Sequence, residues 1–298
     1  MNRVLITGAD GFTGRYLAAE LRTTGVEAHG LVRNPIALDD LAAVHVADLA
    51  DYAALLRVIQ QVQPTHVAHL AAISFVAHGQ VDEIYAVNLL GTCHLLDALV
   101  RSGVSVQSVL LASSANIYGN SFYDAPLTEA TPAEPTNDYA VSKFAMEYMA
   151  RLFQDRLPMT VVRPFNYTGR GQSSAFLLPK IVDHFKRRAP VIELGNLDVE
   201  RDFSDVRVVV EIYRRILETP AAVGGTFNVC SGKALSLAEV LHMAREISGH
   251  EIDVRVNPSF VRANEVKRML GSRSKLESII GPVVDIPLRE TLLWMLTS

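Results

Sequence analysis

The stretch that decides the fold is Arg3-Val4-Leu5-Ile6-Thr7-Gly8-Ala9-Asp10-Gly11-Phe12-Thr13-Gly14. Its first five residues form an apolar run typical of a buried strand, and glycines at positions 8, 11 and 14 follow directly. After Gly14, apolar residues recur at helical spacing as far as Thr24-Gly25, and residues 27–32 predict a second strand. We therefore expect a strand, a glycine turn, a helix and a strand, which is the context of a dinucleotide-binding loop.

Each glycine has a physical task in such a loop. Gly8 permits the tight turn, Gly11 lets the backbone approach a diphosphate, and Gly14 lets the helix pack closely on the sheet. The diphosphate then lies on free N–H groups at the positive end of the helix. The alternative, three turn glycines that bind nothing, is disfavoured by the strand and helix on either side.

The end of the second predicted strand decides which dinucleotide is bound. An acidic residue there binds the adenosine ribose hydroxyls of NAD, whereas an arginine can pair with the 2′-phosphate of NADP. The residues found are Leu31-Val32-Arg33-Asn34, and no carboxylate follows until Asp39. Arg33 therefore favours NADP(H), with an ordinary surface-loop arginine as the alternative.

Strand and helix segments keep alternating beyond this unit, which is typical of a doubly wound parallel sheet. Further strands are expected at residues 43–46, 65–70, 108–113 and 159–163, and helices at residues 53–63, 81–101 and 137–156. We predict an α/β Rossmann fold with strand order 3-2-1-4-5-6. The NADP-binding domain is expected over residues 1–164, with residues 201–230 returning to it. A smaller C-terminal α/β substrate-binding domain is expected over residues 165–200 and 231–298.

Composition excludes several classes of protein. The 298 residues carry 28 Lys+Arg against 32 Asp+Glu, with no basic stretch longer than Lys186-Arg187-Arg188, which disfavours nucleic-acid binding. No apolar run approaches the ~18 residues needed to span a membrane. Cys93 and Cys230 are far apart and no Cys/His cluster exists, so we expect no disulfide framework, no metal site and a cytoplasmic location.

A second motif carries chemistry. Ser113-Ser114-Ala115-Asn116-Ile117-Tyr118-Gly119 follows a predicted strand, and Tyr139-Ala140-Val141-Ser142-Lys143 follows further along. Tyr139 and Lys143 are four residues apart, so they share one face of a helix. A phenol with a pKa near ~10 is a poor acid or base at neutral pH, and we expect the ammonium to lower that pKa. A Tyr–Lys pair alone would be an ordinary helix feature, but here it accompanies a strand-anchored serine and a dinucleotide loop.

These motifs resemble the extended short-chain dehydrogenase/reductase superfamily, in its sugar-nucleotide branch. Asp48-Leu49, Leu70-Ala71-Ala72 and Asn88 match landmarks of the family's cofactor domain. The segment from Arg163 to Gln172 resembles the RPFNHTGPGQ segment of GDP-mannose 4,6-dehydratases and GDP-4-keto-6-deoxy-mannose reductases. It departs from that pattern at Tyr167, in place of His, and at Arg170, in place of Pro.

The resemblance implies a role for each matching residue. Tyr139 would be the acid/base at the sugar oxygen, Lys143 would bind the nicotinamide ribose and tune Tyr139, and Ser114 would share the substrate oxygen. The implied cofactor-binding residues are Gly8, Gly11, Phe12, Thr13, Gly14, Arg33, Asp48, Leu49, Leu70, Ala71, Ala72, Asn88, Tyr139 and Lys143. The implied substrate-binding residues are Ser74, Asn116, Asn166, Lys180, Arg201, Arg262 and Glu265.

Within the last group, Asn166 and Lys180 would touch the nucleotide sugar, Arg201 and Arg262 would clamp the diphosphate, and Glu265 would hold the guanosine ribose. Guanidinium forks suit phosphate oxygens, although surface salt bridges are the alternative for both arginines. The resemblance also implies a homodimer joined through the helices at residues 81–101 and 137–156. Its substrate would be a nucleotide sugar, most simply a GDP-linked one.

Two reactions of this family compete. A 4,6-dehydratase needs a base for the C5 proton and an acid for the C6 hydroxyl, supplied in the dehydratases by a Glu two residues after the catalytic Ser/Thr. Asn116 stands at that position here, and an amide cannot exchange a proton near neutral pH. We therefore predict NADPH-dependent reduction of GDP-4-keto-6-deoxy-D-mannose at C4, giving GDP-D-rhamnose or its C4 epimer. The alternatives are GDP-mannose 4,6-dehydration, another epimerase or dehydratase reaction, and a non-catalytic NADP-binding scaffold.

Overall fold

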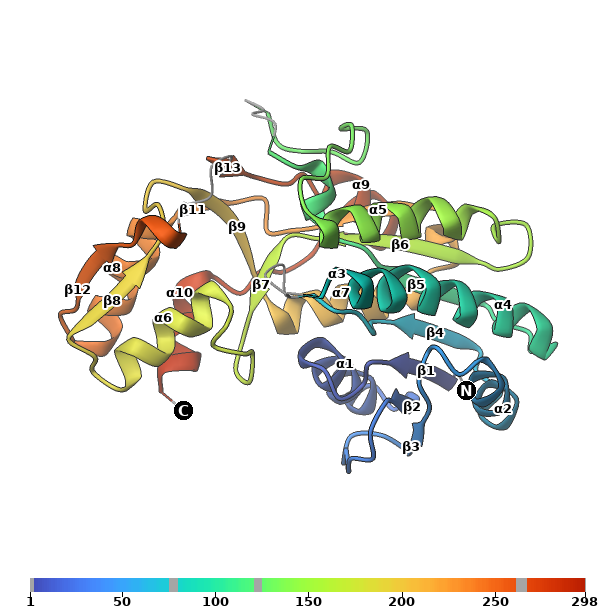
Figure 1. Cartoon of the computed structure of the whole chain (residues 1–298). Coiled ribbons are helices and arrows are strands. Elements are labelled where there is room, and N and C mark those ends of the chain that lie inside the picture. Colours follow the sequence, from blue (N-terminus) through green and yellow to red (C-terminus); the bar gives the residue numbers. More distant parts are fainter. Residues whose placement is uncertain (1–2, 75–79, 121–124, 261–266, 298) are drawn as a thin grey trace.

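The computed structural model describes residues 3–74, 80–120, 125–260 and 267–297. In this part of the chain, seven parallel strands form one sheet in the order β10-β6-β5-β4-β1-β2-β3 (Figure 1). The strands are β1 (Arg3–Thr7), β2 (Glu27–Val32), β3 (Ala43–Val46), β4 (His66–His69), β5 (Ser108–Ala112), β6 (Met159–Pro164) and β10 (Thr226–Val229). The predicted α/β fold and the order of its first six strands are confirmed, and β10 adds a seventh strand beside β6.

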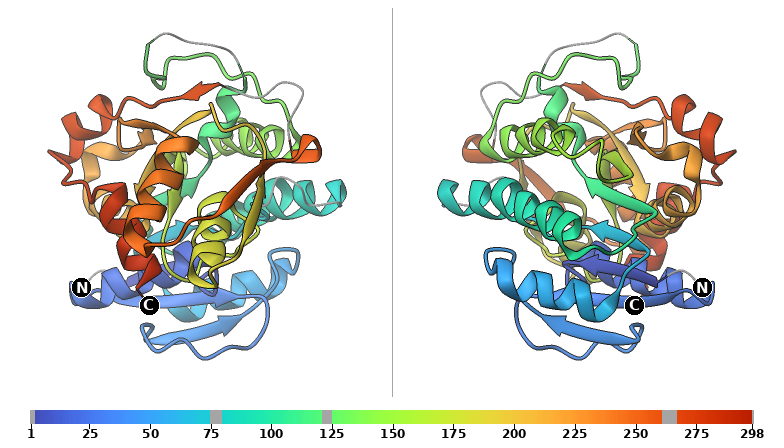
Figure 2. Two further views of the ribbon diagram at one scale, coloured as in Figure 1. Left: turned by 90° about the vertical axis from the view of Figure 1, so that its left-hand side faces the viewer. Right: turned by 90° about the vertical axis from the view of Figure 1, so that its right-hand side faces the viewer.

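Helices cover both faces of this sheet because successive strand side chains point to opposite sides. Val4 and Ile6 of β1 face α1 (Phe12–Thr23) and α7 (Val206–Glu218) in one buried cluster. Leu5 of the same strand faces a second cluster with α2 (Tyr52–Val62), α4 (Thr92–Ser102) and α5 (Asp138–Arg151). Figure 2 shows the same layers from the two sides. The sheet is thus buried on both faces, as parallel sheets are.

The predicted helix at residues 81–101 is one continuous helix with an irregular middle. It consists of α3 (Val81–Tyr85), a π-helical turn at Ala86–Gly91 and α4. Asn88 lies in that turn, where its side chain accepts from the Ile73 N–H at 2.9 Å and donates to Ser142 Oγ at 3.0 Å. This contact fixes the chain after β4 against α5. By length and composition alone, Val81–Ser102 could also cross a membrane, but core helices of globular proteins pass the same test, and Leu95 and Leu99 are buried against the sheet.

The helix predicted at residues 137–156 ends earlier, at Arg151, and tight turns such as the one from Phe153 N to Ala150 O follow it. A buried ion pair holds α5 against β6. Arg163 Nη2 lies 2.7 Å from Glu147 Oε2, and Arg163 Nε donates to the other carboxylate oxygen at 3.0 Å. Removing one partner of such a pair leaves an uncompensated buried charge, at a cost of about 3–5 kcal/mol. The pair therefore fixes the helix that carries Tyr139 and Lys143.

Most of the remaining elements lie beyond the carboxyl edge of the large sheet, toward the left of Figure 1. Two small sheets are formed there by β7 (Asn166–Thr168), β9 (Glu200–Asp205), β11 (Ala234–Ser236) and β13 (Arg268–Met269), and by β8 (Val191–Leu194) with β12 (Asp253–Val256). Helices α6 (Leu177–Lys186), α8 (Leu237–Ser248) and α10 (Leu288–Leu296) pack with them around a third buried cluster. The other short elements are 3-10 turns at Ala115–Tyr118, Pro220–Ala222 and Pro258–Phe260, and α9 (Ser274–Ile280).

The stretch at residues 201–230 divides between the two parts. Helix α7 and strand β10 lie with the large sheet, whereas β9 pairs with β7, β11 and β13 in the small one. Within residues 231–298, Leu276 of α9 packs into the cluster under the large sheet. A division into a cofactor and a substrate domain remains our proposal; these placements would start the returning segment at about residue 206 and would add about residues 271–286 to the cofactor domain.

Candidate active site

The glycine loop between β1 and α1 has the geometry of a diphosphate cradle. Gly8 has φ +66°, and its N–H donates to Leu31 O at 3.0 Å, which closes the turn onto β2. A Cβ on Gly14 would lie 2.3 Å from Gly8 O, so only glycine lets α1 start this close to β1. Within the described part of the chain no side chain caps α1, which leaves its first N–H groups available to an anion. The residues present therefore fit a dinucleotide cofactor.

Two neighbouring cavities meet at this loop, with volumes of about 270 Å³ and 480 Å³. The smaller one is lined by the predicted cofactor residues Gly8, Gly11, Arg33, Asp48, Leu49, Leu70, Ala71 and Ala72. The larger one is lined by the predicted residues Gly8, Gly11, Phe12, Thr13, Gly14, Leu70, Ala72, Ser74, Ser114, Asn116, Tyr139, Lys143 and Asn166. The cavities share Gly8, Gly11, Leu70 and Ala72, so together they form one extended site for a dinucleotide and a second ligand.

Two segments, the turn after β5 and helix α5, bring the catalytic candidates together in the larger cavity. Ser114 follows β5 and starts a 3-10 turn, where its Oγ accepts from the Asn116 N–H at 3.1 Å. Tyr139 and Lys143 lie one turn apart on α5 and are both buried. Lys143 Nζ donates to Ala112 O at 2.8 Å, which holds the amine at the end of β5.

The acid–base groups differ from expectation in one respect. Burial raises the pKa of Tyr139 to about 12, and the hydrogen bond with Ser114 lowers it by less. The prediction that Lys143 lowers the pKa of Tyr139 is wrong for this structure. Desolvation of the phenolate changes this pKa more than any nearby charge does. Burial also lowers the pKa of Lys143 to about 8, with Glu147 acting in the opposite direction. At neutral pH the phenol is therefore protonated, and it can act as an acid.

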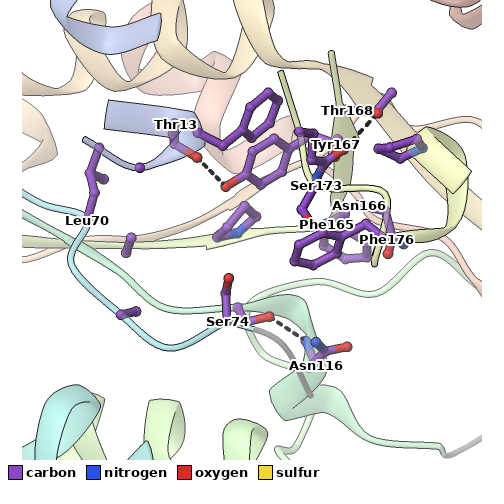
Figure 3. A pocket seen from close by; sticks show the side chains of 18 of the residues that line it. Thr13, Leu70, Ser74, Asn116, Phe165, Asn166, Tyr167, Thr168, Ser173 and Phe176 are labelled. Carbon is purple, nitrogen blue, oxygen red and sulfur yellow. Dashed lines mark hydrogen bonds between the residues drawn. The ribbon is translucent and has the colours of Figure 1, made fainter. Parts of the chain in front are cut away.

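The far wall of the larger cavity comes from β7 and the chain after it. Asn166 is exposed there, and Tyr167 Oη lies 2.7 Å from Thr13 Oγ1, across from β7 to the glycine loop (Figure 3). Thr168 Oγ1 donates to Gln172 Oε1 at 2.8 Å and steadies the loop. Lining residues that the sequence did not single out are Ser113, Thr168, Gln172, Ser173, Phe176, Leu177 and Phe203. Most of these residues lie in or just after the Arg163–Gln172 motif. Their position in the sequence, close after Asn166, could therefore have identified them as lining residues.

Two other predicted substrate residues do not line the larger cavity. Lys180 is not among the described residues lining the cavity: its Nζ donates to Glu193 O at 2.8 Å and lies 4.5 Å from the Phe260 ring centroid. Arg201 lies on β9, where its guanidinium donates to Glu200 O at 2.9 Å. Arg262 and Glu265 lie outside the described residues. For these four residues, contact with a nucleotide sugar stays a prediction.

Comparison with known proteins gives a consistent picture. Residues 5–292 match the family model described as GDP-mannose 4,6 dehydratase. The chain is 33% identical to a GDP-6-deoxy-D-talose 4-dehydrogenase of Aggregatibacter actinomycetemcomitans, over 94% of this chain and 91% of the relative. It is also 33% identical to a GDP-6-deoxy-D-mannose reductase of Pseudomonas aeruginosa, over 97% of this chain and 94% of that one.

Two solved structures match over nearly the full length. The crystal structure of a putative epimerase from Burkholderia cenocepacia has a TM-score of 0.93 and 49% identity, covering 99% of this chain and 97% of that one. The structure of RMD from Pseudomonas aeruginosa complexed with NADPH has a TM-score of 0.88 and 30% identity, covering 100% and 98%. This chain therefore matches known enzymes over nearly its full length. It also contains a glycine loop, a Ser–Tyr–Lys set and a seven-stranded sheet.

Proposed function

Because the chain belongs to the GDP-mannose 4,6-dehydratase family of extended short-chain dehydrogenases/reductases, we propose that it reduces GDP-4-keto-6-deoxy-D-mannose at C4 with NADPH. The product is GDP-D-rhamnose or its C4 epimer, GDP-6-deoxy-D-talose. The names of the two relatives support this choice. One is a GDP-6-deoxy-D-talose 4-dehydrogenase, and the other is a GDP-6-deoxy-D-mannose reductase. Because D-rhamnose is 6-deoxy-D-mannose, these names contain the two proposed products.

The observation that carries the proposal is the lack of an elimination catalyst. Asn116 lines the cavity at the position where a dehydratase needs a carboxylic acid, and its amide cannot take a proton from C5 near neutral pH. Among the described residues that line the larger cavity there is no Asp or Glu. Reduction needs only a proton donor beside the hydride donor, and Tyr139 can be that proton donor.

The chain's own groups would act as follows. Tyr139 donates its proton to the C4 oxygen as that oxygen gains negative charge, and burial has kept this phenol protonated. The Ser114 hydroxyl hydrogen-bonds the same oxygen and holds it beside Tyr139. Lys143, buried one turn further along α5, would donate to the nicotinamide ribose and hold the cofactor beside Tyr139. NADPH, when bound, supplies the hydride that reduces C4.

The proposal takes NADP(H) as the cofactor because of Arg33. This exposed arginine lines the smaller cavity together with Asp48, at the end of β2 where the adenosine ribose is expected. A guanidinium there can pair with a 2′-phosphate. The NADPH in the structure of the Pseudomonas relative supports this assignment.

We also propose a homodimer joined through helix 81–102 and α5. Several large apolar side chains on these two neighbouring helices are exposed: Val81, Leu90, Val141, Tyr148 and Leu152, with exposed fractions of 37–75%. A second copy that covers the same patch would remove these side chains from water. The patch then becomes the seam of a four-helix bundle.

An experiment with two reactions tests the proposed function. The first supplies GDP-4-keto-6-deoxy-D-mannose with NADPH, and the second supplies GDP-mannose with catalytic NADP⁺, each read by absorbance of NADPH and by NMR of the sugar. We expect NADPH oxidation in the first and no change in the second. Formation of the keto sugar in the second reaction, without NADPH oxidation in the first, would establish a dehydratase instead.

A further inference from the structure

Tyr167 and Arg170 are the two positions where the Arg163–Gln172 motif departs from the family pattern. In the structure, both residues connect β7 and its loop to the start of α1. The Tyr167 ring stacks on Phe12 with centroids 6.1 Å apart, and the Arg170 carbonyl accepts from Tyr16 Oη at 2.8 Å. Of these two contacts, only the Tyr167 stacking depends on the side chain at the departing position, because any residue offers the carbonyl that Arg170 uses.

The hydrogen bond between Tyr167 Oη and Thr13 Oγ1, at 2.7 Å, reaches the start of α1, where the diphosphate is expected. Thr13 is the second residue of α1, and side chains at a helix start lean toward the N-terminus, where an anion binds. The Thr13 hydroxyl can donate one hydrogen bond and can accept a hydrogen bond at the same time. If Tyr167 donates to Thr13, the Thr13 proton is left to point at a phosphate oxygen.

Either hydroxyl can donate in this hydrogen bond, and a relay to the phosphate needs Tyr167 as the donor. Burial raises the pKa of its phenol, so the phenol keeps its proton at neutral pH. Thr13 Oγ1 is the one hydrogen-bond acceptor found for that proton among the described residues. Stacking on Phe12 and the neighbouring Tyr16–Arg170 contact leave the ring little freedom to turn away.

We propose that Tyr167 is a positioning residue for the cofactor: its phenol donates to Thr13, and Thr13 in turn donates to the diphosphate of NADP(H). Hydrogen bonds in such a chain strengthen one another, and the last one is made to a charged acceptor. Tyr167 thereby couples β7, which carries Asn166 on the substrate side, to the cofactor loop. The inference rests on the cofactor part of the proposed function and does not depend on which sugar is reduced.

The test measures dissociation constants for NADPH by fluorescence titration without any sugar. The variants are Tyr167→Phe, which keeps the stacked ring, Thr13→Val, and the double substitution, with Thr13→Ser as the control that keeps a hydroxyl. We expect Tyr167→Phe to weaken NADPH binding by about threefold to tenfold and Thr13→Val by about tenfold. In the Thr13→Val background, Tyr167→Phe should add less than about twofold. Thr13→Ser should bind nearly as wild type.

Adenosine 2′-phosphate serves as the second probe, because it occupies the Arg33 end and carries no diphosphate. Its affinity should be the same in all variants. Unchanged NADPH binding by Tyr167→Phe, independent effects of the two substitutions, or equal weakening of adenosine 2′-phosphate would each overturn the relay. A wild-type protein that bound no NADPH would instead refute the cofactor assignment.

Discussion

Replacing Lys143 by Met should change how the stability of the protein depends on pH. Burial lowers the pKa of this amine from 10.5 to about 8. Each pKa unit corresponds to about 1.36 kcal/mol, so holding the ammonium in the folded protein below pH 8 costs about 3 kcal/mol. Between the two pKa values the unfolded chain binds more protons than the folded one, and this contribution to stability therefore rises with pH.

The size of the effect can be worked out for accessible conditions. For the pKa values above, the Lys143 contribution increases by about 1.3 kcal/mol between pH 7 and pH 9. Lys143→Met also removes the hydrogen bond to Ala112 O, worth about 1 kcal/mol, but that loss is nearly independent of pH. The difference in unfolding free energy, wild type minus variant, should therefore rise by about 1.3 kcal/mol over this range.

Urea denaturation of both proteins at pH 7, 8 and 9 provides the measurement. Lys233→Met, which removes an exposed amine, is the matched control and should give a constant difference. Lys143→Met should also lose reductase activity, as expected when a functional group is held at a cost in stability. A difference that stayed flat from pH 7 to pH 9, or fell, would refute the buried ammonium as described.

Tyr139→Phe should lower the reduction rate by at least about 100-fold and leave the NADPH dissociation constant within about threefold, because it removes only the proton donor; equal loss of binding would contradict this role. Arg33→Ala should weaken NADPH by at least tenfold, or about 1.4 kcal/mol, and leave NADH unchanged in the same titration; equal effects on both would refute NADP(H) specificity. Leu90→Arg together with Leu152→Arg should yield a monomer by light scattering, whereas Val284→Arg, at an apolar site 79% exposed on another surface, should leave a dimer; a wild-type monomer would contradict the dimer.

The features predictable from sequence are those with local physical causes. The strand, glycine turn and helix at residues 3–23 follow from hydrophobic spacing and from glycines that a Cβ would make impossible, as at Gly14. The order of the first six strands follows from the rules for alternating strands and helices. That Ser114, Tyr139 and Lys143 line one cavity was predictable because each keeps a fixed relation to one such element.

The features missed depend on tertiary environment. The spacing of four residues predicted that Tyr139 lies beside Lys143. Nothing in the local sequence indicates that both side chains are buried, and burial is the main cause of the pKa shift of each. The β13 strand has two residues, too few for any periodicity, and exists only through pairing with β9. Thr13 and Tyr167 are 154 residues apart, so no sequence window contains their hydrogen bond.

The most direct test of C4 reduction follows the hydride itself. The protein is given GDP-4-keto-6-deoxy-D-mannose and NADPH that carries deuterium at both hydrogen positions of the nicotinamide C4, and the sugar is read by ¹H and ²H NMR. We expect one deuterium at sugar C4, none at C5 or C6, and no transfer by Tyr139→Phe. The proton couplings of the product then identify the rhamnose or the talose epimer. Deuterium absent from C4, with GDP-mannose dehydrated by the same preparation, would contradict the account.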